Sequence, residues 1–330
     1  MTTSTAKLDV IPPNRDLAST PRAFGFRNIG AIYVWVLIIV VFSLLEPDTF
    51  PTLATFRSIL NNNAVTGLIT LSVVIPMAAG VFDVSVANIA GFSGVLAAWW
   101  MANTGFPPML AILLTVLVAM VLGVVNALVV VNLKVVPLIG TLGTGAIFFA
   151  MTKWVSDEKY ITERVPELTR LVARGQIWGI TTPVFIMLAV MLVVAYMLEF
   201  TTTGRAWYAI GFDPEVARLA GLRVKVLQFV AFMISAAISG LAGVIITARV
   251  NSGSPEAGPS YLLPAFAAVF LGATQFRHGR FNVWGAIVAV LLLGTGEVGL
   301  SLAEAPTWAP NVFQGIVLIA SMAITRAEQR

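Results

Sequence analysis

Residues 60–102 have the sequence LNNNAVTGLITLSVVIPMAAGVFDVSVANIAGFSGVLAAWWMA, in which Asp83 is the single charged side chain among 43 positions. A helix that crosses the hydrocarbon core of a bilayer needs about 20 mostly apolar residues. This stretch therefore predicts two spanning helices, over 60–80 and 86–102. The short gap between them, Val81 to Ser85, predicts a broken helix around Asp83.

The whole chain has the same character. Of its 330 residues, 58% are hydrophobic and 11% are charged, whereas a soluble domain is about 45–50% apolar and about 25% charged. The chain has no cysteine and one histidine, which excludes disulfides and thiolate metal sites and disfavours Ser-His-Asp hydrolysis. No basic run resembles a nucleic-acid patch. The composition predicts a membrane protein.

Eight further apolar segments continue the pattern, at residues 29–45, 109–131, 136–154, 181–199, 227–249, 263–275, 282–300 and 310–325. We therefore expect an all-α polytopic membrane protein with about ten transmembrane helices, in one domain over 29–325. Eight or nine spans stay open, because the gap at 81–85 and the segment 263–275 are short. Residues 1–28 are expected to form a disordered cytoplasmic tail and 326–330 a second cytoplasmic tail.

The distribution of basic residues predicts the orientation. With the N-terminus inside, 13 of the 20 Lys and Arg residues are cytoplasmic, as the positive-inside rule requires. Both termini are then cytoplasmic, and the longest external segment is 155–180. That segment is polar and mixed in charge, so it is either a solvated loop or a docking surface for an external partner.

No catalytic or cofactor motif is present. The dipeptide Gly-Lys does not occur, so the phosphate-binding loop of ATPases is missing. HExxH and CxxC are also absent, and no pair of carboxylates is spaced for acid–base chemistry. We expect no catalytic residue, no metal site and no bound cofactor, and ATP with magnesium would be held by a partner chain.

The cytoplasmic segment 201–225 contains the signals of one short helix. Asp213 suits the N-cap, Pro214 the first helical position and Glu215 the positive helix N-terminus. Gly221 suits a left-handed C-terminal cap. A helix over 214–220 is therefore predicted. It either rests on lipid as an interfacial helix or docks into a cytosolic motor subunit.

Polar residues in the apolar spans are candidates for a functional site within the membrane, because ionisable groups in a bilayer are costly. Asp83 and Ser85 suit the cap of the second half-helix, and this structural role alone would explain a carboxylate at position 83. The alternative is that Asp83 also contacts a substrate. For Glu297 two roles stay open: its side chain either faces this site or pairs with a buried partner. The apolar spans also contain hydrogen-bonding and aromatic side chains, namely Asn126, Thr141, Thr144 and Phe148. They either bind a neutral solute or form contacts between helices.

Five motifs, in order, resemble the permeases of ribose-type ABC importers. They are GVFDVSVA at 80–87, VPLIGTLG at 136–143, the TGR…AIG…ARLAGL series over 203–222, SGLAGV at 239–244 and AAVFLG at 267–272. The resemblance covers about residues 29–325. It implies that the ATPase-coupling residues are Gly204, Arg205, Gly211, Asp213, Pro214, Ala217, Arg218 and Gly221.

The resemblance implies a bacterial cytoplasmic-membrane permease that moves a monosaccharide or related polyol inward by alternating access. Its expected partners are two cytosolic ABC ATPases or one fused tandem ATPase, an extracytoplasmic sugar-binding protein, and a second permease copy or paralogue. Two alternatives remain. One is an ABC permease for branched-chain amino acids or nucleosides, and the other is an ion-coupled secondary transporter, which would need paired carboxylates.

Overall fold

The computed structural model describes residues 30–276 and 279–328, and most of these residues are helical. The predicted tail 1–28 and the end of the second tail lie outside the described residues. The helices are α1 (Gly30–Leu45), α2 (Leu53–Ala78), α3 (Val86–Thr104), α4 (Pro108–Ala127), α5 (Pro137–Ser156), α6 (Val165–Val172), α7 (Thr182–Phe200), α8 (Thr202–Phe212), α9 (Pro214–Leu219), α10 (Val224–Val250), α11 (Leu262–Ala273), α12 (Val283–Leu302) and α13 (Ala309–Glu328).

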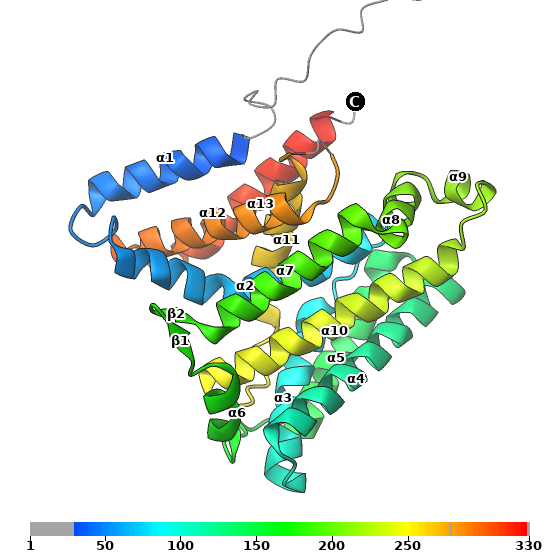
Figure 1. Ribbon diagram of the computed structural model, residues 1–330, viewed down its shortest axis with the longest axis horizontal. Coiled ribbons are helices and arrows are strands. Elements are labelled where there is room, and N and C mark those ends of the chain that lie inside the picture. The colour runs from blue at the N-terminus through cyan, green and yellow to red at the C-terminus, as the bar shows by residue number, and fades with distance from the viewer. Residues whose placement is uncertain (1–29, 277–278, 329–330) are drawn as a thin grey trace, which may run out of the picture.

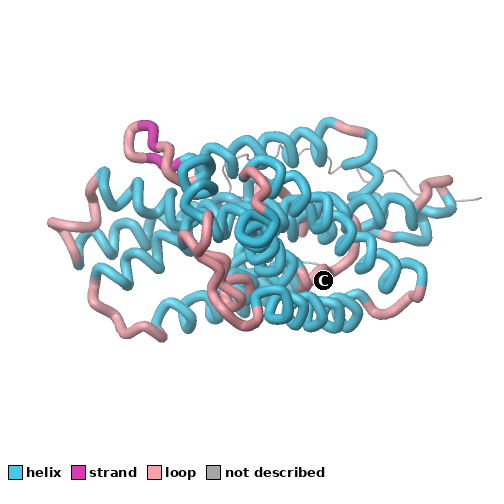
Figure 2. The backbone as a smooth tube through the Cα atoms, turned by 90° about the horizontal axis from the view of Figure 1, so that it is seen from below, coloured by secondary structure: helices cyan, strands magenta, loops and turns pink. Residues whose placement is uncertain are grey.

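Two short elements extend these helices. A π-helical turn, Leu128–Asn132, continues α4, and a 3₁₀ turn, Pro259–Tyr261, precedes α11. Strands β1 (Gln176–Ile177) and β2 (Ile180–Thr181) form one antiparallel hairpin, with Gln176 opposite Thr181. Figure 2 shows that this hairpin is the only strand pair drawn among the helices.

Each of the ten predicted spans coincides with a helix. Within the described residues, six helices are long and apolar enough to cross a membrane: α2, α4 with its π-helical turn, α5, α7, α10 and α12. The helical architecture is therefore confirmed, and the number of crossings remains a prediction. Helix α2 begins seven residues before the predicted span, because Thr52 caps its N-terminus by accepting the Thr55 N–H at 3.2 Å.

Helix α10 crosses the middle of the bundle (Figure 1), where it packs against α2, α3 and α4. Its stripe of small residues allows this close packing. A Cβ on Gly243 would lie 2.0 Å from the Ala90 carbonyl oxygen of α3, and the hydroxyls of Ser239 and Ser72 on α2 are 3.0 Å apart. The stripe at Ser235, Ser239 and Gly243 is thus a helix-packing surface.

The outer helices expose apolar side chains. Leu37 and Leu44 on α1, Leu117 on α4 and Ile139 on α5 are each more than half exposed. In water, apolar surface on this scale is a liability, whereas lipid solvates it. Helix α3 differs, because most of its residues are buried between α4, α5 and α10.

The segment 155–180, predicted to be external, is folded rather than a plain solvated loop. It contains the end of α5, helix α6 and the hairpin. Val165 and Leu168 of α6 are fully buried, and α6 packs on α10. The local signals for α6 are Pro166 at its start, Glu167 in its first turn and Arg170 in its last turn.

Candidate functional site

The predicted break between α2 and α3 is present. Helix α2 ends at Ala78, two residues after Pro76, and Gly80 adopts a left-handed conformation with φ of +74°. The chain then runs without regular structure to Val86. Gly80 also packs against α8, because a Cβ at this position would lie 3.0 Å from the Gly211 Cα. The break therefore directly contacts the segment predicted to couple to the ATPase.

Asp83 lies at the centre of a buried polar cluster. Its Oδ1 accepts hydrogen bonds from the Ser85 hydroxyl at 2.6 Å, the Ser85 N–H at 3.0 Å and the Asn126 amide at 3.4 Å. The Asn126 amide also donates to the Ser85 hydroxyl oxygen at 2.6 Å. Asp83, Ser85 and Asn126 are each 0% exposed. Three elements, the break, α4 and α5, meet at this cluster.

Helix α5 supplies the two threonines of the cluster. The Thr144 hydroxyl donates to the Asn126 side-chain oxygen at 2.5 Å. Thr141 accepts the Val84 N–H at 3.1 Å and lies 2.9 Å from the Pro137 carbonyl oxygen, to which it donates. Thr141 therefore satisfies the half-buried backbone donor of Val84 in the break.

The predicted capping of α3 by Asp83 and Ser85 needs correction. Ser85 occupies the N-cap position, but its side chain makes no capping hydrogen bond to α3. Its hydroxyl is bonded to Asp83 and Asn126 instead. Asp83 bonds the N–H of the N-cap residue itself, and its second oxygen, Oδ2, is buried without a hydrogen-bond partner among the described residues. A cap alone therefore does not account for the carboxylate.

The structure brings five of the seven predicted pathway residues together and leaves two apart. Phe148 is buried one turn beyond Thr144, in an apolar cluster that includes Phe92 and Leu122. Glu297 on α12 is exposed, and no ion pair in the described part of the chain involves it. It lies within electrostatic reach of Tyr261. The five clustered residues are at most 5% exposed, so the cluster is closed to solvent in this conformation.

In the segment 201–225 the predicted short helix is present as α9, but the segment also contains α8 (Thr202–Phe212), which the sequence signals did not predict. Helix α9 spans Pro214–Leu219, and the Asp213 side chain accepts the N–H groups of Glu215 at 2.8 Å and Val216 at 3.0 Å. Gly221 follows with φ of +86°. The Leu222 N–H bonds Ala217 O and the Gly221 N–H bonds Arg218 O, which is the Schellman pattern.

Helix α9 projects from one end of the bundle (Figure 1). The surrounding apolar side chains are exposed: Phe212 by 92%, Leu219 by 76% and Val216 by 60%. Glu215 and Arg218 form an ion pair on the surface, and the guanidinium lowers the pKa of the Glu215 carboxyl. Gly204 and Arg205 lie in the first turn of α8, and Ala217 is buried.

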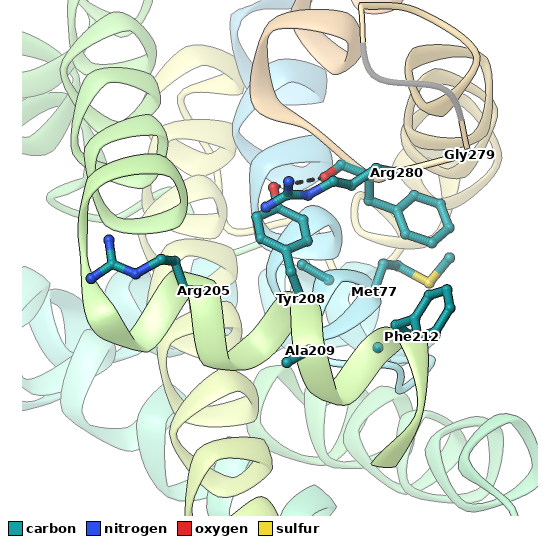
Figure 3. Close-up of a pocket in the computed structure, with 10 residues that line it drawn as sticks. Met77, Arg205, Tyr208, Ala209, Phe212, Gly279 and Arg280 are labelled. Carbon is teal, nitrogen blue, oxygen red and sulfur yellow. Dashed lines mark hydrogen bonds between the residues drawn. The ribbon is translucent and has the colours of Figure 1, made fainter. Parts of the chain in front are cut away.

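A cavity of about 860 Å³ lies beside α8 at the same end of the molecule. Helix α8 contributes Arg205, Tyr208 and Phe212, the end of α2 contributes Met77, and the loop before α12 contributes Arg280 (Figure 3). Tyr208 and Arg280 are not among the site residues predicted from the sequence. In the sequence they are only an aromatic and a basic residue in two separate segments, both predicted to be cytoplasmic.

Comparison with known proteins identifies the family. The model of the family described as "Branched-chain amino acid transport system / permease component" matches residues 55–322. The chain belongs to this family. It is 31% identical to the ribose import permease protein of Bacillus subtilis over 301 residues, covering 91% of this chain and 93% of that protein. The predicted resemblance is thus confirmed.

Other members of the family have similar full-length matches. The D-allose transport system permease protein of Escherichia coli is 31% identical, covering 94% of this chain and 96% of that protein. The L-arabinose transport system permease protein of Escherichia coli is 27% identical, covering 93% and 94%. No solved structure matches the chain. This chain is accordingly a permease component of an ABC import system in the cytoplasmic membrane.

Proposed function

We propose that this permease forms half of the membrane pathway of an ABC importer and carries a monosaccharide or related polyol inward. The buried cluster around Asp83 supports this proposal most directly. It presents a carboxylate, an amide and three hydroxyls from three elements that meet at the broken helix. Irregular backbone at membrane depth is tolerated where it is buried or lines a cavity, and broken helices mark transporter binding sites.

The chemistry of the cluster favours a neutral polyol over an amino acid. A zwitterion needs a cation for its carboxylate, and none of the hydrogen bonds described in the cluster involves a Lys or Arg. A sugar hydroxyl needs acceptors and donors, and Asp83 Oδ2 is an unused acceptor. The relatives named as ribose, D-allose and L-arabinose permeases support the same substrate class.

The exposed tip around α9 is the proposed contact with the ATPase. A partner that pushes on α9 would move α8, since the two helices share Asp213 as the cap between them. Gly211 of α8 contacts Gly80, three residues before Asp83. Movement of the tip would therefore be transmitted through one close backbone contact to the break. Alternating access would follow as the break shifts and the cluster opens.

The remaining partners follow from the proposed orientation. With α9 in the cytoplasm, α6 and the hairpin face outward, where a sugar-binding protein would dock. A second permease copy or paralogue would complete the pathway. The ATPases, two chains or one fused chain, would hold ATP and magnesium. The ion-coupled alternative lacks its expected feature, because no described interaction pairs Asp83 with Glu297.

The experiment that tests the substrate class is competitive uptake. Cells that express the complete import system would take up a labelled pentose or hexose in the presence of unlabelled competitors. We expect monosaccharides or polyols to compete, while leucine and adenosine do not. Competition by leucine or adenosine alone would overturn the sugar assignment in favour of the other ABC permease class.

A further inference from the structure

We propose that the cavity beside α8 is a binding site for a phosphate-bearing ligand, distinct from the transport pathway. Its most informative feature is charge without a counterion. Arg205 and Arg280 both line the cavity, and none of its ten lining residues is acidic. None of the ion pairs in the described part of the chain involves either arginine. Within the described residues, the cavity therefore carries positive charge that no acidic lining residue balances.

The two guanidinium groups come from separate elements. Arg205 belongs to the face of α8 that also carries Tyr208, Ala209 and Phe212 (Figure 3), since these positions are three or four residues apart. Arg280 comes from the loop before α12. A ligand held by both arginines would touch α8 and the loop together, beside the end of α2 at Met77.

Arg280 stacks on Tyr208, and its Nε–H remains available as a hydrogen-bond donor. Its guanidinium carbon lies 3.3 Å from the centre of the Tyr208 ring, and the Tyr208 hydroxyl donates to Phe281 O at 2.8 Å. The Arg280 Nε is buried and has no hydrogen-bond partner among the described residues. A stacked guanidinium keeps its N–H groups in a fixed plane, which is the arrangement that binds phosphate oxygens in pairs.

The rest of the cavity suits the remainder of such a ligand. Met77, Phe212 and Phe281 supply apolar and aromatic surface, against which a sugar ring or an acyl chain can pack. The volume of about 860 Å³ lies within the range of small-molecule sites. The shared chemistry is a phosphate group, and its source is either a phosphorylated sugar in the cytosol or the headgroup of an anionic lipid. The cytosolic source rests on the proposed orientation.

The test uses the purified full-length permease. Thermal unfolding in neutral detergent would be followed by tryptophan fluorescence with inorganic phosphate, a pentose 5-phosphate and the unphosphorylated pentose. In a second arm, nanodiscs of phosphatidylcholine would be compared with nanodiscs that also contain phosphatidylglycerol. Because this experiment does not measure transport, a negative result would overturn the phosphate site and leave the proposed transport function intact. A negative result in the uptake experiment would likewise leave the phosphate site intact.

We expect stabilisation by the pentose phosphate or by phosphatidylglycerol, and the responding arm identifies the source. Arg280→Gln should weaken binding about tenfold or more, since charge-assisted hydrogen bonds are lost. Arg205→Gln is a second variant, because its exposed side chain has no described partner to disrupt. Arg170→Gln, exposed on α6, is the matched control and should bind as the wild type does. No stabilisation in either arm, or equal binding by all three variants, would overturn the proposal.

Discussion

Replacing Asp83 by Asn separates the contact of its carboxylate with cargo from its structural role. Asn retains a side-chain oxygen that can accept both Ser85 donors, at the positions now 2.6 and 3.0 Å from Oδ1. The group that changes is Oδ2, which becomes an amide nitrogen and has no described partner to lose. We therefore expect Asp83→Asn to fold with a stability within about 1 kcal/mol of the wild type.

Transport should respond differently. If a sugar hydroxyl donates to Oδ2 in the open conformation, Asn removes a hydrogen bond to a charged acceptor. Such bonds contribute about 1.5–3 kcal/mol, so uptake should fall about 10- to 100-fold. Asp83→Ala removes both oxygens and leaves the N–H and hydroxyl of Ser85 without this acceptor. At about 1–3 kcal/mol for each buried donor, the loss of stability is about 2–6 kcal/mol, less any relief from removing a buried charge.

The assay combines two measurements on each variant. Thermal unfolding of the purified permease reports stability, and uptake of labelled sugar, normalised to the amount of inserted permease, reports transport. Thr152→Ala serves as a control, because Thr152 is a buried residue of α5 whose hydroxyl, among the described residues, bonds the Phe148 carbonyl of its own helix and no other group. A well-folded Asp83→Asn with normal uptake would refute contact with cargo and leave Asp83 a purely structural role.

Three further predictions concern other parts of the molecule. In intact cells, a cysteine at Gln176 should react with an impermeant thiol reagent, whereas one at Ala209 should not; both positions are exposed, and the reverse pattern would invert the topology. Gly221→Pro should abolish uptake and substrate-stimulated ATP hydrolysis while the permease still inserts, because proline cannot adopt φ of +86°; full transport would exclude α9 as the coupling helix. Gly243→Ala should destabilise the purified permease by about 1–3 kcal/mol or more in thermal unfolding, since its Cβ would lie 2.0 Å from a carbonyl oxygen of α3, whereas Gly143→Ala, with open space around the Cβ, should be neutral or stabilising; equal effects would contradict the packing account.

Most of the fold could be predicted from the length of the apolar segments and from local helix-capping signals. The ten apolar segments coincide with helices, and the signals at Asp213, Pro214 and Gly221 placed α9 to within one residue. These signals succeed because they act within one turn of the chain. Helix α6 was missed although its signals are local, because its segment is polar and mixed in charge overall and was therefore interpreted as a loop. Within it, Val165, Leu168 and Val172 recur at helical spacing and are the residues that become buried.

The candidate site was predictable only in part. Polar residues in apolar spans gave Asp83, Ser85, Asn126, Thr141 and Thr144, because burial of polar groups demands partners wherever they lie. The same criterion also selected Glu297, which does not join the cluster. Whether two distant residues meet depends on helix packing, which no local pattern encodes. The contact of Gly80 with Gly211 and the stacking of Arg280 on Tyr208 are of this kind.

The energy source of transport tests the central claim most directly. The permease would be reconstituted in proteoliposomes with its ATPase and its sugar-binding protein, and uptake would be measured with ATP, with a non-hydrolysable analogue, and with a proton or sodium gradient alone. We predict uptake only with ATP and only when the ATPase is present. Sugar uptake by the permease alone, driven by an ion gradient, would contradict the account.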